Sequence, residues 1–163
     1  MDELEMWLGY ERQLLDRLLF KLVVGRELLA TGEVRFLGPA TAEVLRAASR
    51  VQEAELVRAV QLSRLAGEWE MPVENMTLET LSWATPEPYR TLFEDHLTGF
   101  ASLLIEIDAV AAQAGRMATR GARRHAHAGY PAMLSATVGV SLPSLTDFLG
   151  ERLRPLEAVS WDG

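Results

Sequence analysis

Long segments of this chain place apolar residues at alternating steps of four and three positions. The clearest case runs from Tyr89 to Met117 and keeps this rhythm for about four heptads. The spacing puts one side chain per turn on a single helix face, and a stripe of that length needs a partner helix along it. The pattern therefore predicts an all-α fold: an elongated antiparallel helical bundle with coiled-coil-like packing.

Residues that begin or end helices separate the periodic segments. Gly32 follows the first segment directly, as a left-handed C-terminal cap does. Thr77 and Thr85 are favourable N-cap residues, and Pro86 fits the first turn of a helix that follows Thr85. We predict three long helices with a short helix before the third: about 2–30, from Pro39 or Thr41 to Trp69, a short helix at 78–84, and a third long helix from 86.

Residues 129–163 differ in composition from the periodic part of the chain. Pro131, Pro143 and Pro155 interrupt them. Proline removes a backbone donor and clashes with the preceding helical turn, so a long helix is excluded there. We predict a helical bundle domain at 1–128 and a flexible tail at 129–163, in which SLPSLTDFLGERL could form one short amphipathic helix.

Cysteine use and charge exclude several kinds of protein. Cysteine is absent, which removes disulfides, thiolate zinc sites and cysteine nucleophiles. The net charge of −7 opposes phosphate contact, so we expect no nucleic-acid partner. The N-terminus lacks the cations of a signal peptide, and no apolar run reaches the roughly 20 residues of a membrane span. We expect a cytoplasmic protein without membrane insertion.

The three histidines do not form a recognisable metal or catalytic motif. His96 follows Glu94 and Asp95 directly, whereas a Glu-x-x-His spacing is needed to place both ligands on one helix face. His125 and His127 are two positions apart and would diverge on a helix by about 200°. No glycine-rich phosphate loop or nucleophile elbow is present. We expect a packed or paired His96, no catalytic residue, no cofactor and no metal, and hence no enzyme.

The first predicted helix has more apolar surface than one neighbouring helix can cover. A leucine arc fills one side, and a second stripe lies on the far side. The stripe, called the α1 stripe below, consists of Met6, Tyr10, Phe20, Val24 and Leu28. A third helix of the bundle, a second copy of the chain or another protein's amphipathic helix could cover it. Tyr10, Phe20, Val24 and Leu28 are therefore candidate partner-binding residues.

Charged residues stand out at two places in the sequence. Glu11 interrupts the apolar seam of the first helix, while Glu55 and Arg58 occupy seam positions of the second and could pair across to another helix. Segment 115–129 carries four arginines and no acid. Its cations could stabilise a helix C-terminus, meet an acidic partner, or dock against the acidic first two helices.

Three stretches resemble the FlgN family of flagellar export chaperones, especially its actinobacterial branch. They read ERQLLDRLLFKLVVGRELLATGEVRFLGPATAEV, EAELVRAV and TLETLSWATPEPYRTLFEDHLTGFASLLIEI. The similarity covers roughly residues 4–110, with a weaker likeness in VSLPSLTDFLG near the C-terminus. It rests on the pattern of leucines and helix breaks. After the final EI the family commonly has asparagine and leucines, whereas this chain is richer in alanine and arginine.

The resemblance implies a cytoplasmic chaperone that binds the helical C-terminal segments of hook-associated proteins, which form the hook–filament junction, before their export. Contact with the export gate is a further possibility. The family's client site lies in the second half of the last helix. Here that implies Val110, Ala114, Met117, Arg120 and Arg124. The alternative is a self-associating structural or regulatory bundle without a chaperone role. We expect either a monomer or a homodimer.

Overall fold

The computed structural model describes residues 1–122 and 144–150, and within these ranges it is helical and contains no strand. Residues 144–149 form a short helix, called the tail helix below. The remaining elements, in chain order, are α1 (Asp2–Thr31), η1 (Val34–Phe36), α2 (Leu37–Glu68), η2 (Val73–Asn75), α3 (Leu78–Ala84) and α4 (Tyr89–Ala122). The predicted all-α fold, with three long helices and a short helix before the third, is confirmed.

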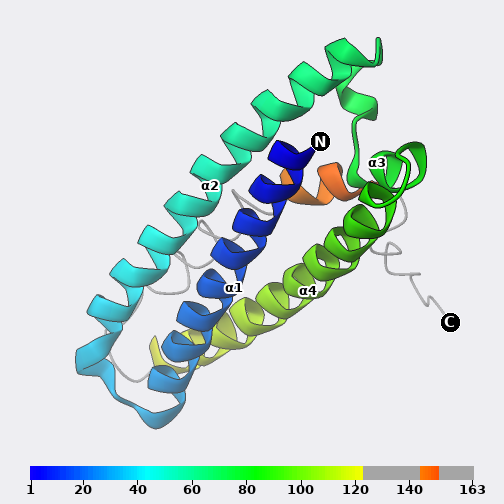
Figure 1. Cartoon of the computed structure of the whole chain (residues 1–163). Coiled ribbons are helices and arrows are strands. Elements are labelled where there is room, and N and C mark those ends of the chain that lie inside the picture. The colour runs from blue at the N-terminus through cyan, green and yellow to red at the C-terminus, as the bar shows by residue number, and fades with distance from the viewer. Residues whose placement is uncertain (123–143, 151–163) are drawn as a thin grey trace, which may run out of the picture.

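The helix α1 lies between α2 and α4 and packs along both of them (Figure 1). Glu3, near the start of α1, contacts Arg64 near the end of α2 at 3.2 Å. Lys21, in the second half of α1, pairs with Glu43 in the first half of α2. These contacts show that α1 and α2 are antiparallel, as expected for neighbours joined by a short connection.

The helices α1 and α4 run in the same direction. Tyr89 at the start of α4 hydrogen-bonds to Asp2 at the start of α1. Farther along both helices, Arg26 donates to Gln113 at 3.1 Å. The three long helices are therefore arranged up-down-up: α2 is antiparallel to α1 and α4, whereas the α1–α4 interface is parallel. With 34 residues, α4 is roughly 50 Å long, so the bundle is elongated.

The predicted apolar seams form the core of the bundle. Most of the α1 arc, the α2 seam and the α4 seam is buried, as the spacing predicted. The buried α1 and α2 side chains of these seams are Leu4, Leu8, Leu14, Leu15, Leu18, Leu22, Val44, Ala48, Val51, Leu62 and Leu65. Trp7, Leu19, Leu29 and Trp69 belong to the same two seams and are half-buried. At two places beyond Phe100, however, the buried residue of α4 lies one position past the predicted seam, whereas Ile107, Val110 and Ala114 are buried within it. Leu104 and Ala118 are buried, while Leu103 and Met117 are only half-buried. The shift arises because 3.6 residues per turn drift by about 20° per heptad from a strict seven-residue repeat.

Two of the predicted helix ends are confirmed. Gly32 caps α1 in the left-handed region, with φ 73°. Thr77 Oγ1 accepts a hydrogen bond from the Thr80 backbone N–H at 3.1 Å and so caps α3. The start of α2 lies slightly earlier than predicted, at Leu37, which places Pro39 in the first helical turn, where proline is tolerated.

The predicted start of α4 at Pro86, with Thr85 as its N-cap, is wrong. Thr85 instead follows the end of α3, and its hydroxyl donates to the Leu81 carbonyl at 2.8 Å. The helix α4 begins at Tyr89. A residue that precedes proline is disfavoured in the helical region, and the sequence TPEP contains two such residues, Thr85 and Glu87. The prolines therefore delay the helix instead of starting it.

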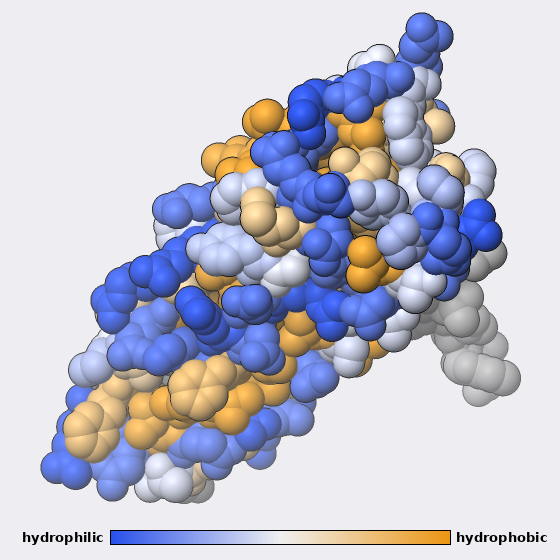
Figure 2. Space-filling view, in the orientation of Figure 1, coloured by the Kyte–Doolittle hydropathy of each residue, from blue (hydrophilic) through white to orange (hydrophobic). Residues whose placement is uncertain are grey.

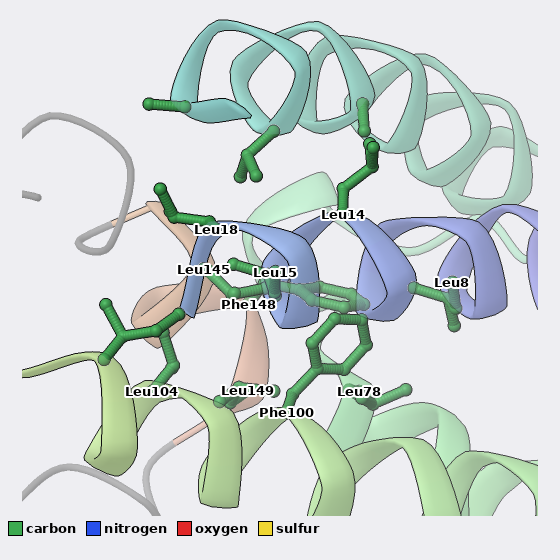
Figure 3. Close-up of a cluster of buried hydrophobic side chains, with 14 of the residues drawn as sticks. Leu8, Leu14, Leu15, Leu18, Leu78, Phe100, Leu104, Leu145, Phe148 and Leu149 are labelled. Atoms are coloured by element: carbon green, nitrogen blue, oxygen red, sulfur yellow. The ribbon is translucent and has the colours of Figure 1, made fainter. Parts of the chain in front are cut away.

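The tail helix packs inside the bundle, although the sequence assigned it to a tail outside the domain. Leu145, Phe148 and Leu149 are all buried. Figure 3 shows them between α1 and α4, close to Leu15 and Phe100. The bundle core thus includes residues beyond position 128. The rest of the predicted tail lies outside the described residues, apart from Gly150.

Within the described residues, α4 has one segment, Tyr89–Ala118, that is long and apolar enough to cross a membrane by length and composition alone. Core helices of water-soluble proteins pass the same test, and the apolar seam of α4 packs against α1 in this bundle. The absence of membrane insertion therefore stays a prediction.

Candidate partner-binding surface

The α1 stripe lies on the side of α1 that neither α2 nor α4 covers. Met6, Tyr10 and Phe20 are 59%, 43% and 58% exposed, and Val24 and Leu28 are half-buried. The two neighbouring helices contact the leucine arc on the opposite side of α1. Figure 2, drawn with α1 in front, shows apolar side chains (orange and tan) at the surface between charged ones. Within residues 1–122 and 144–150, no other helix covers these three side chains.

A groove runs between α1 and α2 beside Phe20, with a volume of about 420 Å³. Its apolar lining comes from Leu14, Phe20 and Ala47. Four cations and two acids complete the lining: Arg17, Lys21, Arg46, Arg50, Asp16 and Glu43. This α1–α2 groove is thus basic on a chain whose net charge is −7. It combines an apolar floor with cations that would attract acidic side chains of a partner.

The opposite side of the stripe, between α1 and α4, is polar. Arg12 crosses from α1 to Asp95 of α4 at 2.6 Å. Its guanidinium lies over Gly99, where an added Cβ would stand only 2.4 Å from it. Glycine at this position therefore lets the arginine lie flat across the interface. A groove of about 510 Å³ also runs along this side, but Leu103 is the single apolar side chain in its lining. The α1–α2 groove therefore offers the larger apolar lining beside the stripe.

The residues implied by the family resemblance are divided between core and surface. Val110 and Ala114 are 8% and 0% exposed and belong to the bundle core. Met117 is half-buried, and Arg120 is exposed, with its Nε donating to the Arg116 carbonyl at 3.3 Å. Arg124 lies outside the described residues, as do His125 and His127. The first two side chains are not available to a partner while the bundle is closed.

The core also holds an ion pair across α1 and α2. Arg58 pairs with Glu11, and the two side chains are 3% and 1% exposed. The prediction that Arg58 pairs with another helix is confirmed. The spacing of the seams did not identify Glu11 as the partner of Arg58. The position of Glu11 in an otherwise apolar seam was nevertheless a signal that it needs a buried partner.

Burial changes the titration of this cluster. Burial raises the pKa of Glu11, and the charge and hydrogen bond of Arg58 oppose that rise. Glu55 lies 4.0 Å from Arg58. Burial raises the pKa of Glu55 to about 7, against the pull of Arg58 and with a contribution from the Glu11 carboxylate. Near neutral pH, Glu55 is therefore poised between its charged and neutral forms.

His96 is a packed core histidine. It is 5% exposed, and its ring centroid lies 6.1 Å from that of Phe100. Its Nε2 is 3.7 Å from Glu5 Oε1. Burial lowers the pKa of His96, and the nearby Arg12 lowers it further, while Glu5 and Asp95 oppose them. Among the residues that the structure describes, no group of three or more His, Asp or Glu side chains is arranged to hold a metal ion.

The fold and this surface define the class of the protein, an all-α bundle that exposes an apolar helix face beside a basic groove. Comparison of the chain with family models, curated proteins and solved structures found no match.

Proposed function

We propose that this protein is a cytoplasmic binding protein of the flagellar export chaperone type. It holds the helical C-terminal segments of hook-associated proteins in an export-competent form, and it works by binding and not by catalysis. The resemblance to the FlgN family supplies the class of client. The observation that carries the proposal is the exposed α1 stripe beside the basic α1–α2 groove.

The stripe suits an amphipathic helix laid along α1. Its exposed side chains recur on one face over several turns, from Met6 through Tyr10 to Phe20. A client helix would remove this apolar surface from water, which contributes about 25 cal/mol per Å² buried. Acidic side chains on the client would meet Arg46 and Arg50 at the edge of the groove. Because a disordered client must fold as it binds, part of the contact energy is lost in ordering it, which keeps binding reversible.

The test uses purified C-terminal fragments of the hook-associated proteins of the source organism and measures their affinity for the full chain. A variant carrying Phe20→Glu and Val24→Glu should bind at least about tenfold more weakly, because it places charges on the apolar stripe. Circular dichroism should show unchanged helicity.

Leu56→Glu/Val60→Glu is the matched control, because it adds the same two charges at α2 positions that are 70% and 66% exposed and do not belong to the stripe. It should bind the fragments like the unaltered chain. If the fragments bind no better than scrambled amphipathic peptides, the chaperone proposal fails.

A homodimer that buries the same stripe is the second candidate function, because Met6, Tyr10 and Phe20 would serve a second copy equally well. Sedimentation distinguishes the two. A tight dimer that Phe20→Glu converts to a monomer, and that client fragments do not dissociate, would favour a self-associating bundle over a chaperone.

A further inference from the structure

The tail helix is a short amphipathic segment seated in a groove of the long-helix bundle. Its buried anchors are Leu145, Phe148 and Leu149, which are 0%, 6% and 1% exposed. They follow the spacing i, i+3 and i+4, so they lie on one helix face. Figure 3 shows that face directed at α1 and α4. We call the surface beneath it the tail-helix groove.

Polar contacts fix the register of the tail helix in the groove. Arg58 of α2 places its guanidinium carbon 4.6 Å from the centroid of the Phe148 ring. The same guanidinium donates to Ser144 Oγ at 3.5 Å. After the helix, Gly150 turns with φ 104°, and a Cβ there would meet Glu79 Oε2 of α3 at 2.7 Å. The groove therefore recognises a hydroxyl, a leucine, an aromatic ring, a leucine and a glycine in a fixed order.

The tail helix depends on this groove for its structure. An isolated helix shorter than about 12 residues is marginal in water, because one turn fixes several residues for a single hydrogen bond. Residues 144–149 make fewer than two turns. Docking therefore supplies the stability of the tail helix, and its own helical propensity contributes little.

The floor of the groove is not a purely apolar core. Two carboxyl groups, from Glu11 and Glu55, share the Arg58 guanidinium there. Among the described residues, Glu11 Oε2 has no hydrogen-bond partner. Burying charged groups is costly unless each has its hydrogen-bond partners. The tail helix is therefore held less firmly over this cluster than it would be over an apolar floor of the same size. A helix of similar sequence can therefore replace the weakly bound tail helix.

We propose that the tail-helix groove is a second docking site, which accepts an amphipathic helix of another protein with the pattern Ser-Leu-x-x-Phe-Leu-Gly in exchange for residues 144–150. The chain's own segment occupies the site until a competing helix replaces it. This site is separate from the α1 stripe, so it does not depend on the proposed client binding there.

Because the tail helix already occupies the groove, it lowers the apparent affinity for a helix added in solution. A tethered segment competes at an effective concentration of about millimolar. An incoming helix therefore sees only the fraction of molecules in which the groove is open, and its apparent affinity falls by that fraction. Weakening the chain's own anchors should raise the apparent affinity for a helix added in solution.

The probe is a fluorescent synthetic peptide of residues 141–152, added to the full chain. In the release variant, Leu145→Asp and Phe148→Asp place charges on two buried anchors. We expect this variant to bind the peptide at least about tenfold more tightly than the unaltered chain. A peptide carrying the same two aspartates should not bind either protein.

The matched control chain carries Leu56→Asp and Val60→Asp, which add the same two charges at positions 70% and 66% exposed. It should bind the peptide no more tightly than the unaltered chain. The proposal is overturned if the release variant binds no better than this control, or if both peptides bind alike.

A second measurement covers the case in which the release variant does not fold. Hydrogen exchange of the unaltered protein compares the tail-helix amides with those around Leu15 and Leu18 in α1. We expect at least about tenfold lower protection in the tail helix, because it opens without global unfolding. Equal protection would show that the segment leaves the groove only when the whole bundle unfolds, and the exchange proposal would then be wrong.

Discussion

Replacing Arg58 by methionine should strongly destabilise the bundle, because it leaves Glu11 buried without its counterion. Glu11 is 1% exposed, and its charge is compensated by Arg58. Removing one member of a buried ion pair typically costs about 3–5 kcal/mol, because the remaining charge keeps its desolvation penalty. The contact of Arg58 with the Phe148 ring, at 4.6 Å, is lost as well. We therefore expect Arg58→Met to lower the free energy of unfolding by about 3–5 kcal/mol.

Removing both charges should reverse most of this loss. In Glu11→Leu/Arg58→Met, apolar side chains of similar volume replace the pair, and such replacements range from neutral to about 4 kcal/mol stabilising. Glu55 also loses Arg58 in this variant. Its pKa is already about 7, so it takes up a proton more readily than an ordinary glutamate. The double variant should therefore be clearly more stable than Arg58→Met.

The assay is urea unfolding followed by circular dichroism, with linear extrapolation to water for all three proteins. Glu11→Leu alone completes the double-mutant cycle and gives the coupling energy between the two residues. The reasoning is refuted if Arg58→Met costs less than about 1 kcal/mol, or if the double variant is no more stable than Arg58→Met.

Three further predictions concern the stability of the fold. Leu18→Ala should cost about 2–5 kcal/mol in urea unfolding, because Leu18 is 1% exposed in the core; a smaller loss would show that the site collapses around the smaller side chain. Gly32→Ala should cost about 1 kcal/mol, because φ is 73° there, and Gly32→Asn should cost less; equal melting temperatures for all three proteins would contradict this. The pKa of Glu55, raised to about 7, means that the folded state holds this proton more tightly than the unfolded state. Glu55 should therefore contribute roughly 0.5–1 kcal/mol of added stability between pH 8 and pH 6.5. His96 opposes this gain toward the lower end of the range, because its lowered pKa means that the unfolded state takes up a proton first. The gain should be missing in Glu55→Gln, measured against the unaltered chain at each pH.

Sequence periodicity was sufficient to predict the secondary structure and most of the core. Alternating four- and three-residue steps identify helix faces, because the helical repeat is a local property of the backbone. Gly32 and Thr77 were identified as caps for the same reason, since a cap depends on a few neighbouring residues. The start of α4 was missed because two prolines separated by a single residue outweigh a good capping threonine.

The candidate surface was only partly predictable. The α1 stripe followed from the helical wheel, and its exposed part is where the sequence placed it. The basic α1–α2 groove was not predicted, because its cations come from helices whose relative rotation no local pattern specifies. Val110 and Ala114 lie on the apolar seam and are buried in the core, as the seam pattern predicted. The resemblance had instead implied that they bind a partner.

Residue spacing along the chain is enough to show that this protein is all-α and that one helix carries two apolar faces. Both follow from the repeat of side chains around a helix. Tertiary structure alone decided that Arg58 meets Glu11 and that residues 144–149 lie over that pair. These contacts join positions 47 and 86 residues apart, and such partners are selected by which helix faces come together in three dimensions.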